Sequence, residues 1–360
     1  MSRLAGQLIV LSSIAQFLSA QSAATIADHV TWERDFPNLA VSVTGAAVAD
    51  RSGNLWAVSD NRPSERLICI RPDGVMVVNT ELPKEINPIP PSDKSDFSLA
   101  VSPSGTVVLI ARYSHAIGKA IYFDGAAFGI VKSDGTLGVV KRVARGGPEF
   151  KEFIALSDEH FLLVGDQSPM VVIRLSNDGD VDWRRTFPKN WVLPSASAIE
   201  DGSACIVSPE YGGAFLHLIW IDPKGVMRHQ EQLIGRRSQS AAYEGSCTIL
   251  YDLEPGLRRG EFALTSFDRS FKSVWTTPVL AAAPQGGVYG MAAVSDGYVV
   301  TIGLQDGVFL AKYALGGQVL WAVTDRSRQY ARLIVPAGDS FYLIGAGPKE
   351  QYSLHVIRAH

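Results

Sequence analysis

The chain has 360 residues, of which 46% are hydrophobic and 19% are charged, and its formal net charge at pH 7 is −3. This length and composition can support a large buried core, as two ordinary domains or as one large all-β domain. The balanced charge and the absence of a long basic run argue against a nucleic-acid or membrane-surface partner held mainly by charge.

The first predicted element is a targeting segment. Arg3 is followed by an apolar run over residues 4–18 and by the small residues of 19-SAQSAA-24. This order predicts a secretory signal peptide over 1–24 and one mature domain over 25–360. The alternative is a buried or membrane-anchoring helix, but the run is shorter than the roughly 20 residues that span a bilayer. No later stretch is longer, so we expect an exported protein without a membrane span, either periplasmic or secreted.

After this segment, a unit of four short apolar strands separated by polar turns recurs along the chain. Clear copies occupy 150–187, 195–233 and 289–325, and their turns contain Asp-Gly, Lys-Gly or Gly-Gly pairs, which supply the positive φ of tight turns. The final turns recur about every 45 residues, which is typical of β-propeller blades. The first hairpins of the units begin near Val43, Phe97, Phe153, Ser195, Ser240, Gly290 and Ala331. The sequence therefore predicts an all-β, seven-bladed propeller of four-stranded blades, whose fifth blade is the weakest copy.

The last unit, 331–360, ends after its third strand, whereas the strand 30-VTWERDF-36 precedes the first unit without a partner. We therefore expect the N-terminal strand to complete the C-terminal blade and close the ring. Such closure leaves no blade edge that requires a second copy, so we expect a monomer.

Four tryptophans, Trp32, Trp183, Trp275 and Trp321, occupy the same place in the outer strand of different units. Their periodicity favours residues that pack between blades over an aromatic ligand platform. The three cysteines are too few for a disulfide framework. Cys205 and Cys247 occupy nearly matching positions of neighbouring units, so either a disulfide or two small buried side chains is consistent with the pattern.

The segments 176-SNDGDVDWRRTF-187 and 314-ALGGQVLWAVTD-325 resemble the tryptophan-docking repeats of quinoprotein-like (PQQ-like repeat) β-propellers. The resemblance covers most of the mature chain. It implies a propeller that binds partners or, in the enzymes of that group, a quinone cofactor held with calcium. The segment 44–63 is similar to the first blade of exported esterase-like phytase propellers, in which Asp60, Asn61 and Arg62 are the matching residues.

Propellers bind ligands at the end of the central channel formed by the loops between strands two and three and between blades. The candidate residues that the sequence assigns to these loops are Asp60, Asn61, Arg62, Arg112, His115, Asp166, Glu210 and Asp306. Asp60, Asp166 and Glu210 could bind Ca²⁺ through their carboxylates, and Arg62 and Arg112 could hold a phosphate or carboxylate. The alternative is an ordinary solvated rim.

Three hypotheses about function follow. The first is an exported binding module that takes a protein or small ligand on the loop face, because no motif demands catalysis. The second is a Ca²⁺-assisted phosphoesterase or esterase, in which a metal-activated water attacks the ester. The third is a quinone-dependent oxidoreductase. The motifs of serine hydrolases, nucleotide-binding loops and zinc proteases do not occur in the sequence.

Overall fold

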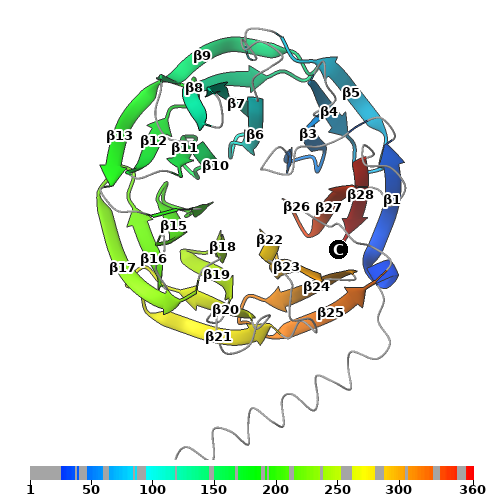
Figure 1. Cartoon of the computed structure of the whole chain (residues 1–360). Helices are drawn as coiled ribbons and strands as arrows, with labels where there is room; N and C mark the ends of the chain where they lie inside the picture. Colours follow the sequence, from blue (N-terminus) through cyan, green and yellow to red (C-terminus); the bar gives the residue numbers. More distant parts are fainter. Residues whose placement is uncertain are drawn as a thin grey trace, which may run out of the picture.

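The computed structural model describes residues 26–36, 39, 47–59, 65–83, 86, 95–117, 120–145, 150–166, 169–187, 191–192, 194–210, 215–235, 238–252, 262–279, 288–304, 307–326, 333–346 and 354–360. These residues form seven four-stranded antiparallel sheets arranged as the blades of a ring (Figure 1). The predicted all-β, seven-bladed propeller is confirmed. Among the described residues, the helical element is a single 3₁₀ turn, η1 (Ile26–His29), and no helix is long and apolar enough to cross a membrane.

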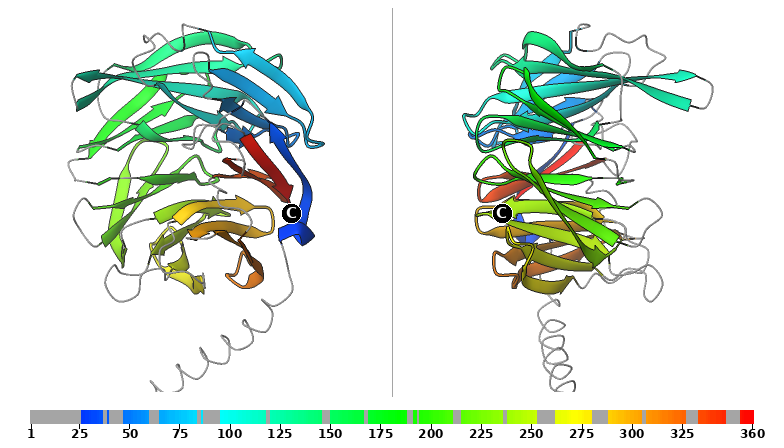
Figure 2. Two further views of the ribbon diagram at one scale, coloured as in Figure 1. Left: turned by 45° about the vertical axis from the view of Figure 1, so that its right-hand side comes forward. Right: turned by 90° about the vertical axis from the view of Figure 1, so that its left-hand side faces the viewer.

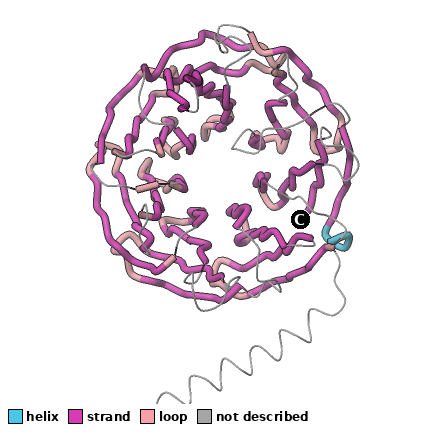
Figure 3. Tube along the Cα trace, viewed as in Figure 1, coloured by secondary structure: helices cyan, strands magenta, loops and turns pink. Residues whose placement is uncertain are grey.

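Each blade runs from an inner strand next to the ring axis to an outer strand at the circumference (Figure 3). The inner strands are β2 (Ala47–Ala49), β6 (Ser95–Val101), β10 (Phe150–Ala155), β14 (Ser195–Ala198), β18 (Ser238–Tyr243), β22 (Val288–Val294) and β26 (Leu333–Ala337). The second strands are β3 (Leu55–Ser59), β7 (Val107–Ile117), β11 (Phe161–Gly165), β15 (Ala204–Pro209), β19 (Ser246–Asp252), β23 (Gly297–Leu304) and β27 (Ser340–Ala346). We number the blades one to seven in this order.

The third strands are β4 (Arg66–Ile70), β8 (Ala120–Val131), β12 (Met170–Leu175), β16 (Phe215–Ile221), β20 (Phe262–Phe267), β24 (Gly307–Ala314) and β28 (Leu354–Ala359). The outer strands are β5 (Met76–Glu81), β9 (Leu137–Arg145), β13 (Val181–Phe187), β17 (Met227–Ile234), β21 (Ser273–Val279), β25 (Val319–Asp325) and, for blade seven, β1 (Val30–Phe36). The second and third strands are almost continuously buried, whereas the outer strands alternate. This difference follows from the position of each strand, since central strands are covered on both faces and outer strands border solvent.

The ring closes as the sequence predicts. Strand β1 pairs antiparallel with β28, from Val30 opposite Ala359 to Phe36 opposite Leu354. The N-terminal strand therefore supplies the outer strand of the C-terminal blade, at the right of the ring in Figure 1. Beyond the end of β28, the backbone N–H of His360 donates to the carbonyl of His29 at 3.2 Å, so a hydrogen bond joins the two chain segments where other blades have a turn.

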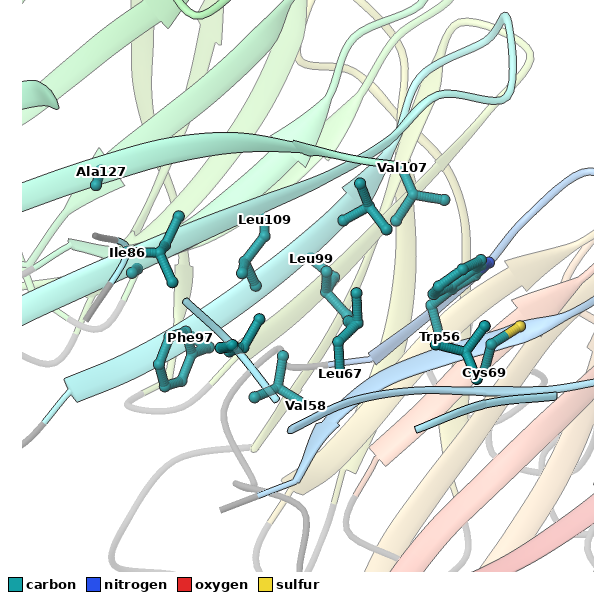
Figure 4. Close-up of a cluster of buried hydrophobic side chains, with 14 of the residues drawn as sticks. Trp56, Val58, Leu67, Cys69, Ile86, Phe97, Leu99, Val107, Leu109 and Ala127 are labelled. Carbon is teal, nitrogen blue, oxygen red and sulfur yellow. The ribbon is translucent and has the colours of Figure 1, made fainter. Parts of the chain in front are cut away.

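Hydrophobic clusters fill the seams between neighbouring blades. Figure 4 shows the cluster between blades one and two, in which Trp56, Leu67 and Leu109 meet Phe97 and Ile86. Each cluster draws on at most two adjacent blades, or on the chain that connects them. Because every seam repeats this packing, burial of apolar surface is distributed around the whole ring.

The tryptophans of the outer strands dock on the next blade. Trp32 donates its indole N–H to the carbonyl of Pro72 at 2.6 Å, and Trp183 donates to the carbonyl of Pro223 at 2.9 Å. Both partners lie 40 residues further along the chain, in the turn between the third and outer strands of the following blade. The prediction that these tryptophans pack between blades is therefore confirmed for Trp32 and Trp183.

The turn between the third and outer strands contains a residue of positive φ, which is glycine in blades such as the third and Phe271 in blade five. Gly179 has φ +81°, and a Cβ atom there would lie 2.5 Å from Cδ1 of Phe128 in the preceding blade. Phe128 is fully buried and packs edge-on against Phe161. Any side chain at position 179 would therefore combine an unfavourable backbone conformation with displacement of a core aromatic ring.

We expect Gly179→Ala to lower the free energy of unfolding by about 2–4 kcal/mol, because left-handed strain and overpacking add. Urea denaturation followed by tryptophan fluorescence measures this change. Gly338→Ala is the matched control, since Gly338 has φ +69° but no heavy atom within 4 Å of its hypothetical Cβ. The free energy of unfolding of that variant should fall by only about 1 kcal/mol, because only the positive φ is unfavourable for alanine. Equal losses in the two variants would show that the contact with Phe128 contributes nothing.

Cys205 and Cys247 form a disulfide, which resolves the two alternatives left by the sequence. Cys205 lies on β15 of blade four and Cys247 on β19 of blade five, so the bond crosses a blade seam. Both residues are fully buried. The third cysteine, Cys69, is a free buried thiol, and burial raises its pKa to about 12.

Candidate functional site

The two ends of the ring differ in their connections. The turn face carries the hairpin turns between first and second strands and between third and outer strands, each of about five residues or fewer, such as 50–54 and 176–180. The loop face carries the connections between second and third strands and between blades, among them 37–46, 82–94 and 253–261. Insertions therefore accumulate on the loop face, which is the face where the sequence places the candidate residues.

Two arginines on the turn face join neighbouring blades. Arg174 of blade three is buried, bonds to Asp158, and donates from Nη1 to the carbonyl of Gly202 in blade four at 3.2 Å. Arg269 of blade five contacts Asp201 of blade four at 2.7 Å. These contacts assign Arg174 and Arg269 to packing between blades three to five.

The structure places Arg112 and His115 in a strand, whereas the sequence analysis assigns them to a loop. Both belong to β7, which is longer than its counterparts in the other blades and pairs with an equally extended β8. Paired residues continue from Val108 opposite Ile130 to Ile117 opposite Ala120. The loop prediction is therefore wrong for these two residues, because the turn of this hairpin lies further out than the repeat pattern suggests. Figure 2 shows the hairpin projecting beyond the other blades.

Arg112 lies under the loop face, between blades two and three. It is 6% exposed, and its guanidinium donates to the carbonyl of Phe97 at 3.2 Å and to that of Phe150. Phe97 is on the inner strand of blade two and Phe150 on that of blade three, so Arg112 joins two inner strands. A guanidinium held in this way has a fixed position and a desolvated charge. It therefore makes the electrostatic potential around it more positive.

Glu152 is the acidic neighbour of Arg112 and was not anticipated from the sequence. It lies on β10 directly after a β-bulge, where the register with β11 shifts between Phe150 and Glu152. Burial raises the pKa of the Glu152 carboxyl to about 8, although the charge of Arg112 opposes this shift. At neutral pH the folded protein therefore holds mainly the protonated acid on an inner strand. Such a perturbed carboxyl beside an arginine is typical of functional sites.

A sequence signal for Glu152 exists. The inner strands of other units contain small residues, as in 195-SASA-198 and 290-GMAA-293, whereas the corresponding strand of blade three reads 150-FKEFIA-155. Two consecutive charged residues, Lys151 and Glu152, in an inner strand distinguish this blade from those two units and mark a special position.

We expect Glu152→Gln to remove a pH dependence of stability. The carboxyl titrates near pH 8 in the folded state and near its model value of 4.5 when unfolded. The folded state therefore binds more protons between these values, and stability falls as pH rises through this window. Because Glu152 is partly exposed, solvent reduces the effect to about 1–2 kcal/mol. Melting curves from pH 5 to pH 9 measure it.

The glutamine variant should melt higher than the wild type at pH 8.5, and the difference should vanish near pH 5. Glu81→Gln, at the exposed end of β5, serves as the control and should show no such trend. Parallel pH profiles for the wild type and Glu152→Gln would contradict the raised pKa.

Blade four contributes an aromatic and acidic group to the loop face. Trp191, in the connection between blades three and four, forms a backbone bridge with Glu210 and is buried. Its ring lies 5.3 Å from that of His217, whose Nε2 is 4.0 Å from a carboxylate oxygen of Glu210. Phe215, at the start of β16, is 39% exposed. Glu210 and Phe215 therefore present a carboxylate and an exposed ring side by side, since the N–H of Glu210 bonds to the carbonyl of Phe215 at 3.2 Å.

The other sequence candidates are distributed as follows. Asp166 directly follows β11 and is half-buried. Asp60, Asn61, Arg62 and Asp306 lie outside the described residues. Within the described ranges, no three His, Cys, Asp or Glu side chains form a group that could hold a metal ion. The structure thus brings Arg112 and Glu152 together, and separately Glu210 and His217, all in blades two to four.

Comparison with known proteins gives no family assignment from sequence. No family model matches the chain, and no curated protein matches it. Similarity appears only among solved structures. The β-propeller domain of the trilobed protease from Pyrococcus furiosus, described as having an open velcro topology, is 9% identical with a TM-score of 0.57, and the match covers 89% of this chain and 95% of that one. The likeness is one of fold alone.

Two further solved structures show a similar degree of likeness. BBS1N in complex with ARL6DN is 9% identical with a TM-score of 0.57, over 92% of this chain and 96% of that one. Prolyl oligopeptidase B from Galerina marginata is 12% identical with a TM-score of 0.55, over 91% of this chain and 50% of that one. The chain thus spans about half the length of this oligopeptidase, and the match supports the propeller fold only.

Proposed function

We propose that the protein is an exported binding module that takes a protein partner or a small ligand on the loop face over blades two to four. The observation that carries this proposal is the asymmetry of the two faces. The turn face consists of short hairpin turns, and Arg174 and Arg269 on this face join neighbouring blades. The loop face combines long connections, a projecting hairpin, the Arg112–Glu152 pair and the exposed Phe215 beside Glu210. Exposed aromatic and charged groups over a rigid scaffold are typical of recognition surfaces.

Export is part of this proposal. The predicted signal peptide over 1–24 supports it, and so does the Cys205–Cys247 disulfide, because such bonds persist in oxidising compartments. A relationship to quinoprotein-like propellers is supported by the docking tryptophans that the repeats share. A propeller in the comparison, BBS1N, is itself recorded in complex with another protein, ARL6DN.

A paired surface experiment tests the binding face. The mature protein, residues 25–360, is crosslinked in extract from the exporting host, alongside one variant on each face. Glu210→Ala with Phe215→Ser alters the loop face, and Asp201→Ala with Arg269→Ala alters the turn face. We expect the loop-face variant to lose at least tenfold of a captured species that the turn-face variant retains. Loss in the turn-face variant alone would contradict the proposal.

Thermal melts separate the small-ligand alternatives from protein capture. The purified mature protein is melted with Ca²⁺, with chelator and with a quinone cofactor. A ligand at 100 times its dissociation constant stabilises a protein by about 2.7 kcal/mol. A rise in melting temperature with Ca²⁺ that chelator reverses would favour the metal-assisted hydrolase. A rise in melting temperature with the quinone would favour the oxidoreductase. For the binding module we expect no shift in either arm.

A further inference from the structure

The hairpin of β7 and β8 extends past both of its neighbours in blade two. Strand β7 has 11 residues and β8 has 12, whereas β11 and β12 of blade three have 5 and 6. The first residue of β6, Ser95, lies opposite Tyr113, and the last residue of β9, Arg145, lies opposite Gly125. Beyond Tyr113 and Gly125 the described sheet is therefore reduced from four strands to two.

This two-stranded part, which we call the ribbon, consists of residues 114–117 of β7 paired with residues 120–123 of β8. Figure 2 shows it projecting beyond the other blades. The register shifts between Tyr113 and Ser114, so a β-bulge separates the ribbon from the body of blade two. Bulges increase the local twist and redirect a strand. The bulge therefore marks the base of the ribbon.

The ribbon has two strand edges that no described strand covers. The ladder with β6 stops at Tyr113, and the ladder with β9 stops at Gly125. In an antiparallel pair, alternate residues direct their backbone N–H and C=O groups away from the partner strand. Within the described chain, no further strand pairs with residues 115–117 or 120–123. A two-stranded ribbon alone is only marginally stable in water, so pairing with a third strand would stabilise it.

The ribbon carries little of the protection that natural sheets give to exposed edges. Such edges are usually blocked by charged residues, by proline or by short length. The outer strand β13 follows this rule, since Asp182, Arg184 and Arg185 are exposed along it. The two strands of the ribbon read 114-SHAI-117 and 120-AIYF-123, without proline or acidic residues and with isoleucine and aromatic residues that favour strands. This sequence therefore permits the addition of a strand.

The chemistry of the edges selects the kind of partner. Backbone N–H and C=O groups along an edge match another extended backbone, whereas a bilayer would leave them without hydrogen bonds. A second copy of the chain fits less well, because residues 113–123 contain His115 and Lys119 but no acidic residue before Asp124. Two ribbons would therefore bring segments of the same charge together. A segment that carries Asp or Glu avoids this repulsion.

We propose that the ribbon is a docking edge for an extended, acidic segment of a partner protein, which adds to it as a further β-strand. This inference rests on the proposed function, because it states how a protein partner engages the loop face at blade two. Main-chain hydrogen bonds supply affinity in this mode of recognition, and alternate side chains of the added segment supply sequence preference.

A trimmed variant isolates the ribbon. In it, Asn-Gly replaces residues 114–124 and joins Tyr113 to Gly125, which lie opposite each other. Asn-Gly is a preferred two-residue hairpin turn, and the bonds of Arg112 to Phe97 and Phe150 involve none of the removed residues. We therefore expect an unchanged circular dichroism spectrum. A second variant, Ala116→Glu with Ile121→Glu, keeps the full length of the ribbon and repels an acidic segment.

The probe is a phage-displayed library of random peptides of about ten residues, the length of a long strand. The library is selected on the wild-type mature protein and depleted on the trimmed variant. We expect enrichment of peptides that are rich in β-branched and aromatic residues and contain Asp or Glu. A selected peptide should bind the wild type at least about tenfold more tightly than either ribbon variant. Asp201→Ala with Arg269→Ala, on the turn face, is the control and should bind the peptide like the wild type.

Backbone methylation of the selected peptide tests strand pairing itself. One version carries N-methyl groups on its odd residues and another on its even residues. An added strand donates to the edge from alternate residues only. One version should therefore lose about tenfold or more in affinity, and the other should bind like the unmodified peptide. Equal affinities of the two versions, or failure to enrich any peptide that depends on the ribbon, would overturn the proposal.

Two further outcomes would assign the ribbon to another occupant and contradict the proposal. Self-association in sedimentation that the trimmed variant lacks would identify a second copy. Binding to vesicles of phosphatidylcholine and phosphatidylglycerol that the trimmed variant lacks would identify a membrane.

The crosslinking experiment in extract separates this inference from the proposed function. The trimmed variant is added to it and should lose the captured species together with the Glu210→Ala, Phe215→Ser variant. If the trimmed variant retains a species that the Glu210→Ala, Phe215→Ser variant loses, the loop face binds a partner without the ribbon, and only this inference fails.

Discussion

Trp183→Ala is expected to lower the free energy of unfolding by about 2–4 kcal/mol. The indole packs in the seam between blades three and four and donates to the carbonyl of Pro223 at 2.9 Å. Its ring also covers Gly225, and the guanidinium of Arg185 lies 5.6 Å from its centre. Alanine removes the apolar contact, the hydrogen bond and the support for Arg185 at once, because all three depend on the same ring. Chemical denaturation followed by circular dichroism measures the loss.

Trp183→Phe separates the contribution of aromatic packing from that of the indole hydrogen bond. Phenylalanine keeps most of the aromatic packing but has no N–H, so it should lose only about 1 kcal/mol for the hydrogen bond. If the two variants are equally stable, the packing of the ring contributes little and the docking model of the seam fails.

Removal of the Cys205–Cys247 disulfide is the second large change. In a Cys205→Ala, Cys247→Ala variant we expect a loss of about 3–4 kcal/mol, since the bond closes a loop with a sequence separation of 42 residues and restricts the unfolded chain. The melting temperature should fall by several degrees, and urea denaturation should show the change in stability directly.

Reductant supplies the internal control for this prediction. Wild-type protein unfolded in the presence of reductant should refold to the lower stability of the double variant, whereas the double variant should not respond to reductant. Cys69 stays a free thiol throughout, and its raised pKa makes it unreactive near neutral pH. Equal stability of the wild type and the double variant would show that blade packing alone fixes this seam.

The fold could be predicted from the sequence because its determinants are local and repeated. Turn glycines, such as Gly179, and outer-strand tryptophans, such as Trp183, recur with the period of the blade. Closure by β1 could also be predicted, because a strand without a partner and a unit without a fourth strand imply each other. The disulfide could not be decided, since spacing alone does not reveal whether two thiols of neighbouring blades face one another.

The candidate site could be predicted only in part. The sequence indicates the loop face and draws attention to Arg112, but the bonds of its guanidinium to Phe97 and Phe150 depend on the approach of two inner strands. The raised pKa of Glu152 likewise depends on burial in the folded ring, opposed by the charge of Arg112 from blade two. Such effects arise between blades, and a pattern that repeats within blades carries little information about them.

The pairing of β1 with β28 also determines the order in which the molecule can be built. Strand β1 has its partner among residues 354–359, so a contact of very long sequence separation completes the ring. Blades one to six can form their own hairpins during synthesis, but blade seven must wait for the last strand. The seam of blade seven therefore cannot be buried until residues 354–359 are available to β1, so this seam is expected to be the last part of the ring to become stable.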